Sequence, residues 1–239
     1  MTAAPKAMVM AAGLGKRMRP LTETMPKPLV PVAGKALIDH TLDWLHASGI
    51  KEAVVNTHYL ASMLEEHLKE RSAPHIHISR EEVLLETGGG VKKAMTLLGD
   101  APFVSTNSDV ICVDGDSPTL QRMQQHWDDD TMDILLLLHP VAKAVGYYGN
   151  GDFFWDEAEG LSRRGASAEA PYVFTGVQMI HPRLFVHAPD EDVFSLNYLY
   201  DYALSATPPR LAAIIHDGDW LHIGDPQGVE DAEAFFATR

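Results

Sequence analysis

Residues 10–22 read MAAGLGKRMRPLT, and this stretch decides the fold. It overlaps the end of an apolar run, residues 7–11, that is typical of a buried strand. Gly13 and Gly15 allow the backbone to come close to a ligand, and successive N–H groups in such a loop can surround phosphate oxygens. Open α/β sheets bind ligands at the carboxyl ends of their strands, where this loop lies. The stretch therefore predicts an α/β fold with a phosphate-binding loop after its first strand.

The residues that follow the glycines narrow the type of phosphate loop. A P-loop requires Ser or Thr after its Gly-Lys pair, but Arg17 follows Lys16. A dinucleotide loop requires a third glycine where Met18 stands, and an acidic residue at the end of the second strand, where Asn56 stands. Arg17 and Arg19 add cationic donors suited to phosphates. The sequence thus indicates a nucleotide loop of another kind, with a plain glycine turn as the alternative.

The rest of the chain alternates apolar runs typical of strands with helical patterns. Up to residue 140, this alternation predicts a mostly parallel sheet with right-handed crossovers. The expected helices begin near Ile38, Leu60 and Val91, and the expected strands are residues 7–11, 53–57, 76–78, 103–106 and 132–139.

Beyond Pro140 the pattern changes. Residues 146–155, rich in glycine and aromatic residues, predict a hairpin or lid. We expect further strands at residues 172–180 and 211–216, and helices at residues 196–206 and 226–236. The prediction is a single domain over residues 1–239. Its first half, to about residue 140, would be the nucleotide-binding half with the phosphate loop, and residues 141–239 would form a substrate-binding lobe and the C-terminal helix.

The composition restricts the partners of the protein. The 239 residues include 33 acidic and 19 basic side chains, a net charge of −14 that disfavours binding to nucleic acid. A single cysteine, Cys112, excludes a disulfide framework. The apolar runs are far shorter than the ~20 residues that span a bilayer, and residues 1–6 lack the features of an export signal. We expect no membrane partner, a cytoplasmic location, and a monomer or small homo-oligomer.

Residues 26–32 read PKPLVPV and form a second motif. Three prolines make the segment stiff and extended, and Lys27 stands between two of them. Such a segment can hold an ammonium group at one point, with a solvated lysine as the alternative.

Residues 11–22 and 26–38 (AAGLGKRMRPLT and PKPLVPVAGKALI) together resemble the signature of the sugar-1-phosphate nucleotidyltransferases. These enzymes join a nucleoside triphosphate to a sugar 1-phosphate and release pyrophosphate. The resemblance implies a Rossmann-like, mostly parallel sheet flanked by helices, of the GT-A-like type, with a small substrate-binding lobe. It implies that Lys27 neutralises the α-phosphate and the sugar phosphate, and that Arg17 contacts the leaving pyrophosphate. The implied nucleotide-binding residues are Ala12, Gly13, Gly15, Lys16 and Arg17.

Residues 85–90 read LETGGG and bear on the choice of sugar. Three glycines before a helical pattern suit a group bound against a helix N-terminus, with a flexible cap as the alternative. Within the family, this form is most similar to N-acetylmuramate-1-phosphate uridylyltransferases of cell-wall recycling, which implies UTP and that sugar phosphate as substrates. Mannose-1-phosphate guanylyltransferases and glucose-1-phosphate thymidylyl- or uridylyltransferases are the alternatives. The resemblance further implies a base contact from Glu81 and sugar contacts from Glu86, Gly88, Asn150 and Gly176.

Asp109 closely follows a predicted strand, and its carboxylate is expected near the phosphate loop. Mg²⁺ prefers one or two carboxylates together with phosphate oxygens and waters, so we expect Asp109 to bind Mg²⁺, with a helix cap as the alternative.

By resemblance, residues 220–225 (WLHIGD) are the last family motif, in which His222 replaces the aspartate that usually completes the metal site. Imidazole suits softer metals, so His222 is a ligand if Mn²⁺ is used, or bonds a phosphate or metal-bound water. Asp225 before Pro226 predicts a helix N-cap.

The implied reaction is in-line attack of the sugar phosphate on the α-phosphorus of the triphosphate. No general base is needed, because a phosphate monoester is largely ionised at pH 7. A nucleotide-binding sensor that has lost catalysis is the alternative from another class, and the replacement at His222 is the feature in its favour.

Overall fold

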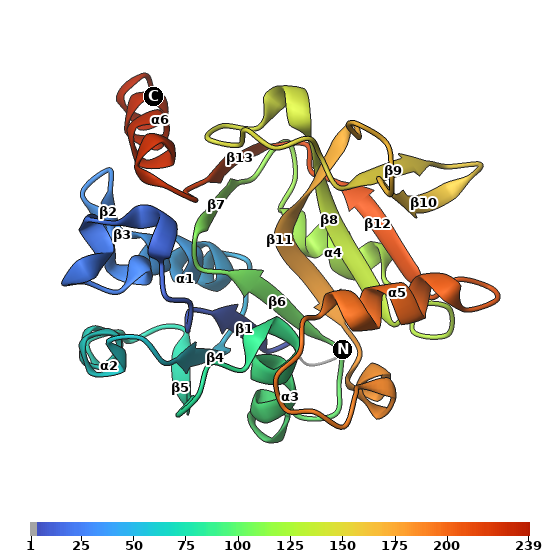
Figure 1. The fold of residues 1–239 in the computed structure, drawn as a ribbon, viewed down its shortest axis with the longest axis horizontal. Helices are drawn as coiled ribbons and strands as arrows, with labels where there is room; N and C mark the ends of the chain where they lie inside the picture. Colours follow the sequence, from blue (N-terminus) through green and yellow to red (C-terminus); the bar gives the residue numbers. More distant parts are fainter. Residues whose placement is uncertain (1–3) are drawn as a thin grey trace.

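The computed structural model describes residues 4–239 and contains a nine-stranded sheet with helices on both faces (Figure 1). Four parallel strands form one side of this sheet in the order β6-β1-β4-β5, with β5 at the edge. Because β1 has β4 on one side and β6 on the other, its carboxyl end is a topological switch point, where such sheets bind ligands. These strands are β1 (Ala7–Met10), β4 (Glu52–Thr57), β5 (His75–Arg80) and β6 (Phe103–Asn107).

The second half of the chain extends the same sheet. β11 (Tyr172–Ile180) runs antiparallel to β6 on one side and to β8 (Ile134–Pro140) on the other. β12 (Leu211–Ile215) pairs with β8 in parallel. β9 (Phe153–Asp156) and β10 (Gly160–Arg163) form an antiparallel hairpin that joins β11 and projects at one end of the molecule (Figure 1).

Side chains that alternate along the strands separate two hydrophobic cores. Val9 and Val55 face one core, where they meet α1 (Leu37–Ala47), α2 (Ala61–Lys69) and α4 (Thr119–His126). Met8 and Val54 face the other core, with α3 (Glu86–Leu98) and α5 (Asn197–Ser205). The result is a three-layer arrangement, which leaves the carboxyl edge of the central strands for the loops that follow them.

A third, smaller core lies beside the phosphate loop. It packs β7 (Val110–Val113) and β13 (Asp219–His222), an antiparallel pair, against α6 (Pro226–Ala237) and the short ribbon of β2 (Pro31–Val32) and β3 (Lys35–Ala36). Short 3₁₀ turns complete the chain at Lys16–Met18, Leu21–Glu23, Lys27–Leu29, Val141–Lys143 and Pro182–His187.

The predicted α/β class and the mostly parallel central sheet are confirmed. The predicted cap is also present, since the Asp225 carboxylate accepts a hydrogen bond from Gly228 N at 3.0 Å. The prediction of a hairpin at residues 146–155 is wrong in position, because the paired strands are β9 and β10 and most of residues 146–152 form a connecting loop. The prediction omitted β7, α4 and β13, which are each eight residues or shorter.

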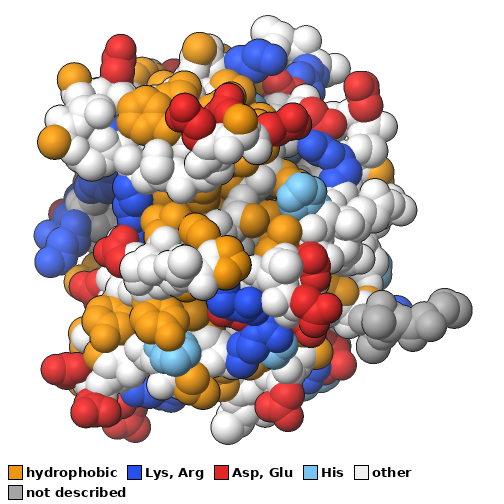
Figure 2. Space-filling view, turned by 90° about the vertical axis from the view of Figure 1, so that its right-hand side faces the viewer, with side chains coloured by type: hydrophobic (Ala, Val, Ile, Leu, Met, Phe, Trp, Pro, Cys, Tyr) orange, Lys and Arg blue, Asp and Glu red, His pale blue; other side chains and the backbone are white. Residues whose placement is uncertain are grey.

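No helix within residues 4–239 is both long and apolar enough to cross a membrane. On the face that Figure 2 shows, which carries the β9–β10 side of the molecule, basic and acidic side chains are interspersed among hydrophobic ones.

Candidate active site

The phosphate loop is fixed at both ends by hydrogen bonds to neighbouring side chains. Ala11 N donates to Asn56 Oδ1 at 2.6 Å, and Ser108 Oγ donates to Met10 O at 2.8 Å. At the other end, Thr22 Oγ1 donates to Gly15 O at 2.7 Å. Gly15 has a φ of 59°, which favours glycine, and a Cβ there would lie 3.1 Å from Lys27 Cβ. The loop is therefore held closely against the segment that carries Lys27.

Lys27 and Asp109 form an ion pair beside this loop. Lys27 Nζ lies 2.5 Å from Asp109 Oδ2, and the two side chains are 12% and 24% exposed. Burial raises the pKa of Asp109, but the Lys27 ammonium, which also donates a hydrogen bond to this carboxylate, and the Arg17 guanidinium together outweigh burial, so the net shift is downward. Asp109 is therefore a carboxylate at neutral pH, in contact with the lysine that the prolines position.

His222 lies at the end of β13, opposite Val110 of β7, and so next to Asp109. Its ring stacks on Trp220 with centroids 5.9 Å apart. A Cβ on Gly224 would lie 2.5 Å from His222 Cε1, so only glycine leaves room for the ring. Burial lowers the pKa of His222 and the Asp109 carboxylate only partly offsets this, so the imidazole is neutral at pH 7.

The donor set around Asp109 fits a metal that takes most of its ligands from the substrate. Within residues 4–239, no three His, Cys, Asp or Glu side chains are arranged to hold a metal ion. Mg²⁺ is commonly bound by one or two carboxylates, phosphate oxygens and waters, and Asp109 supplies one such carboxylate beside the phosphate loop. His222 offers a nitrogen, which Mg²⁺ does not favour.

Three adjoining cavities form one groove along the carboxyl edge of the sheet. The first, about 370 Å³, is lined by the phosphate loop from Gly13 to Arg17 with Lys27 and Asp109. The second, about 310 Å³, shares Gly13, Lys27 and Asp109 with the first. It is further lined by Ala11, Ala12, Asn56, Glu81, Leu84 and Glu86. The predicted phosphate residues Ala12, Gly13, Gly15, Lys16 and Arg17 thus all lie along the groove.

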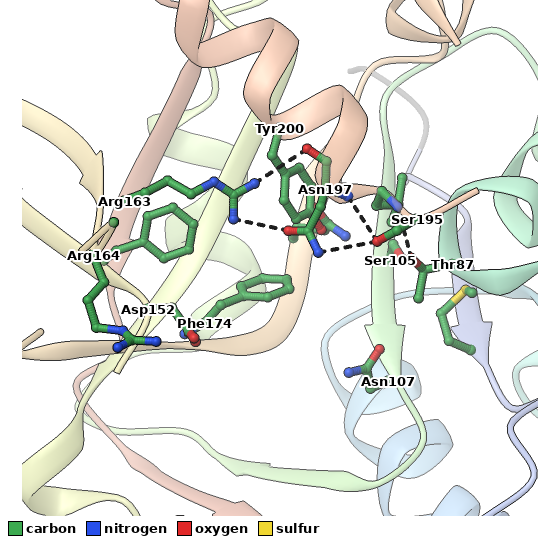
Figure 3. Close-up of a pocket in the computed structure, with 15 residues that line it drawn as sticks. Thr87, Ser105, Asn107, Asp152, Arg163, Arg164, Phe174, Ser195, Asn197 and Tyr200 are labelled. Atoms are coloured by element: carbon green, nitrogen blue, oxygen red, sulfur yellow. Dashed lines mark hydrogen bonds between the residues drawn. The ribbon is translucent and has the colours of Figure 1, made fainter. Parts of the chain in front are cut away.

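The third cavity, about 400 Å³, adjoins the second through Met10, Thr87 and Asn107 (Figure 3). We call it the sugar-side pocket, because Asn150 and Gly176, which were predicted to contact a sugar, lie beside it. Ser105 on β6 and Gln178 on β11 stand opposite each other in its floor and are 1% and 2% exposed. The residues that complete its wall are Asp152, Phe153, Arg163, Arg164, Gly165, Phe174, Ser195, Leu196, Asn197 and Tyr200.

Sequence reasoning missed almost every residue of the sugar-side pocket. The available signal was polar residues within buried strands, since Ser105, Asn107 and Gln178 interrupt apolar runs in β6 and β11. Arg163 is the last residue of β10 and Arg164 follows it, in a hairpin with few apolar residues, so neither gave such a signal.

Glu81 lines the second cavity, but its carboxylate is engaged within the protein. It is 3% exposed, and it accepts hydrogen bonds from Asn56 Nδ2 at 2.7 Å and Leu85 N at 3.1 Å. Asn56 in turn holds Ala11, so Glu81 positions the phosphate loop through Asn56, and its direct contact with the base stays a prediction.

The triple glycine has a packing role that differs from the expected one. Gly88 N and Gly89 N both donate to Phe194 O, at 2.8 and 3.1 Å, so neither amide is free for a ligand. A Cβ on Gly88 would lie 2.3 Å from Phe194 Cε2, and one on Gly89 would lie 2.0 Å from Asp192 O. The glycines thus admit the 192–194 segment against α3, and Gly88 lines none of the three cavities, so its contact with the sugar stays a prediction. Glu86 is exposed and lines the second cavity.

The two remaining predicted sugar residues lie beside the pocket and do not line it. Asn150 is exposed, and its backbone oxygen accepts from Ala170 N at 2.7 Å; Asp152 of the same loop lines the pocket instead. Gly176 has a φ of 85° where β11 is irregular, and a Cβ there would lie 2.8 Å from Asn107 Nδ2. The glycine therefore leaves space for Asn107, which does line the pocket.

The fold and the groove define a class of enzyme, and comparison with known proteins agrees. Residues 6–150 match the nucleotidyl transferase family, and the chain belongs to it. The resemblance seen in residues 11–38 is thereby confirmed. The crystal structure of a UDP-glucose pyrophosphorylase complexed with UDP-glucose shares the fold, with a TM-score of 0.78 at 20% identity, covering 98% of this chain and 99% of that one.

Curated relatives are more similar in sequence. The chain is 44% identical to the N-acetylmuramate alpha-1-phosphate uridylyltransferase of Caulobacter vibrioides, with 99% of each chain covered. It is 31% identical to the enzyme of the same name from Neisseria meningitidis serogroup B, with 96% of this chain and 97% of that one covered. Mannose-1-phosphate guanylyltransferases are also related, at greater distance.

Proposed function

We propose that the protein transfers uridylyl groups from UTP to N-acetylmuramate 1-phosphate, forming UDP-N-acetylmuramate and pyrophosphate. The 44% identity to the Caulobacter vibrioides enzyme over 99% of both chains carries this proposal. The groove supports it, because a phosphate loop with a cationic side and a separate polar pocket suits a nucleoside triphosphate and a sugar phosphate bound side by side.

In the proposed reaction, an oxygen of the sugar phosphate attacks the α-phosphorus of UTP. The new P–O bond forms as the bond from the α-phosphorus to the bridging oxygen of the β-phosphate breaks, and pyrophosphate leaves with that electron pair. The attacking phosphate is already ionised near neutral pH, so the protein need not remove a proton. Catalysis then depends on holding the two reactants in line and neutralising their charge.

Lys27 and Arg17 supply positive charge for this step. We assign Lys27 to the α-phosphate and the attacking phosphate, since Lys27 lines both the first and the second cavity. Arg17 lines the first cavity only, which suits the β- and γ-phosphates that become pyrophosphate. Asp109 orients the Lys27 ammonium through their 2.5 Å contact.

We propose Mg²⁺ as the cofactor, with Asp109 as its protein ligand. Bound there, Mg²⁺ would neutralise charge on the triphosphate. His222 adjoins this position and would tolerate Mn²⁺ as an alternative ion.

The location and purpose of the reaction follow from the substrates. UTP is a cytoplasmic metabolite, so we place the reaction in the cytoplasm. N-acetylmuramate is a sugar of the bacterial cell wall, and an enzyme that activates its 1-phosphate serves re-use of that sugar in peptidoglycan recycling.

The test is pyrophosphate release from UTP, dTTP, GTP or CTP with N-acetylmuramate, N-acetylglucosamine, mannose or glucose 1-phosphate, in Mg²⁺ and in Mn²⁺. We expect the highest kcat/KM for UTP with N-acetylmuramate 1-phosphate. Preference for GTP with mannose 1-phosphate would reject the proposed substrates while keeping the reaction. UTP binding without pyrophosphate release from any pair would reject the enzyme and favour a nucleotide sensor.

A further inference from the structure

The sugar-side pocket carries more positive charge than a neutral sugar requires. Two arginines, Arg163 and Arg164, line it together with a single acidic residue, Asp152. Asp152 Oδ2 accepts a hydrogen bond from Phe174 N at 3.0 Å. In a chain with a net charge of −14, a pocket whose lining side chains sum to a positive charge indicates a ligand with an anionic group there.

Arg163 is held in one orientation before any ligand binds. Its Nε donates to Asp201 Oδ1 at 2.8 Å, and one terminal nitrogen donates to Asn197 Oδ1 at 3.0 Å. The other terminal nitrogen donates to Asn197 O at 3.4 Å. The guanidinium carbon also lies 5.5 Å from the ring centroid of Phe153 and 5.7 Å from that of Tyr200. Figure 3 shows this guanidinium meeting Asn197 across the pocket from Asn107.

These contacts leave part of the Arg163 guanidinium available. Arginine has five N–H groups, and three of them are used by Asp201 and Asn197. The remaining two lie one on each terminal nitrogen, and a carboxylate can accept a charge-assisted hydrogen bond from such a donor. The Asp201 side chain is 67% exposed, so water screens its charge and it does not occupy the guanidinium fully.

Arg164 is placed differently and serves as the comparison. One of its terminal nitrogens donates to two carbonyls of its own loop, Ser167 O at 3.2 Å and Ala168 O at 3.4 Å. Its Nε is enclosed and has no hydrogen-bond partner among the described residues. Within residues 4–239, no aromatic ring packs on its guanidinium in the way that Phe153 and Tyr200 pack on that of Arg163.

The position of Arg163 matches one group of the proposed substrate. N-acetylmuramate is N-acetylglucosamine with a lactyl ether on O3, and that ether ends in a carboxylate. The phosphate on C1 must lie toward Lys27 and Asp109, and the O3 ether projects away from it. That direction leads from the second cavity, past Asn107, into the sugar-side pocket, whose wall includes Arg163.

The floor of the pocket fits the rest of the same sugar. Gln178 lines the pocket. Its side-chain oxygen Oε1 is buried and has no hydrogen-bond partner among the described residues. A buried acceptor without a donor is costly, and the N–H of the acetamido group on C2 would satisfy it.

Resting on the proposed function, we propose that Arg163 determines sugar specificity by binding the lactyl carboxylate of N-acetylmuramate 1-phosphate. The experiment compares kcat/KM for this substrate and for N-acetylglucosamine 1-phosphate, with UTP, in the wild type and in Arg163→Gln and Arg164→Gln. We expect Arg163→Gln to lower kcat/KM for the lactyl substrate by about 10- to 100-fold, mainly through KM, and to leave the other substrate within about threefold. Arg164→Gln should preserve the ratio between the two sugars.

An unchanged ratio in Arg163→Gln would overturn the proposal, as would a ratio lost only in Arg164→Gln. Should Arg163→Gln fail to fold, the wild type can be assayed with the lactyl carboxamide of the substrate, which should lose the same 10- to 100-fold; equal use of carboxylate and carboxamide would overturn the proposal. A wild type that does not use N-acetylmuramate 1-phosphate at all would reject the proposed function itself, a result distinct from an altered ratio.

Discussion

Lys27 and Asp109 stand 82 positions apart in the sequence, and Lys27 Nζ lies 2.5 Å from the Asp109 carboxylate. The first follows Pro26 in a 3₁₀ turn, and the second lies two residues beyond the end of β6. Their contact joins the segment after the phosphate loop to the carboxyl edge of the sheet. Because both side chains are largely shielded from water, the pair holds the ammonium group in place before the phosphates arrive.

The first prediction concerns Lys27. Replacing it in Lys27→Ala removes the positive charge that we assign to the α-phosphate, so kcat should fall by about 10²- to 10³-fold. Steady-state pyrophosphate release measures this, and circular dichroism checks that the fold is retained. The matched control is Lys35→Ala, which breaks an exposed pair with Asp43 at 2.7 Å and should leave kcat unchanged. Wild-type turnover by Lys27→Ala would show that the lysine has no role in the reaction.

A second prediction tests the metal and its ligand together. Asp109→Asn keeps the size of the side chain but removes the carboxylate, so we expect a loss of at least about 10²-fold in kcat and a higher Mg²⁺ concentration for half-maximal activity. EDTA should abolish wild-type turnover, and added Mg²⁺ should restore it. Asp43→Asn, at the exposed pair with Lys35, is the control. Full activity of the wild type in EDTA would exclude the proposed cofactor.

The sequence predicted the phosphate side of the groove better than the sugar side, for a physical reason. Residues 12–17 form one contiguous segment shortly after β1, so the residues that make up this part of the groove are adjacent in the sequence. The sugar-side pocket is assembled from β6, β10, β11 and the start of α5, and no spacing within the chain shows that Ser105, Arg163 and Asn197 meet. Tertiary pairing alone brings them together.

The triple glycine shows how the same residues admit two physical explanations. Glycines before a helix suit either a bound ligand or close contact with another segment of the chain. Only the structure distinguishes these possibilities, because the segment ending at Phe194 lies about 100 positions away from Gly88 and packs directly on it. The strands of the central sheet were predictable because the short apolar runs of β1 and β4, and the alternation of Ile76 and Ile78 with polar residues in β5, needed no such distant partner to be recognised.

A third prediction follows from that packing. In Gly88→Ala, the new Cβ would lie 2.3 Å from the Phe194 ring, so the 192–194 segment must move and the free energy of unfolding should fall by about 1–3 kcal/mol. For a chain of this length, that corresponds to a drop in Tm of roughly 2–4 °C per kcal/mol. Differential scanning calorimetry measures it. Gly13→Ala is the control, because a Cβ at Gly13 meets no atom within 4 Å and should leave Tm unchanged. Equal Tm values for the two variants would contradict the packing role.

The last prediction concerns acid stability and rests on His139 in β8. This residue is 1% exposed, and both ring nitrogens lack a hydrogen-bond partner among the described residues. Burial disfavours the imidazolium and lowers the pKa of His139 from 6.5 to about 4. Between these two values the unfolded chain binds the proton and the folded chain does not. Stability is therefore complete above about pH 6.5 and is lost as the pH falls toward 4.

Urea unfolding at pH 7.5 and at pH 5.0 tests this prediction. We expect His139 to account for a decrease of about 2 kcal/mol in the free energy of unfolding between these pH values. His139→Phe keeps a buried ring without a titratable group and should reduce the acid-dependent loss by that amount. His187→Phe is the control, because His187 stacks on Tyr202 at the surface, and it should leave the pH dependence as in the wild type. If His139→Phe and the wild type lost the same stability on acidification, His139 would not be the group that titrates.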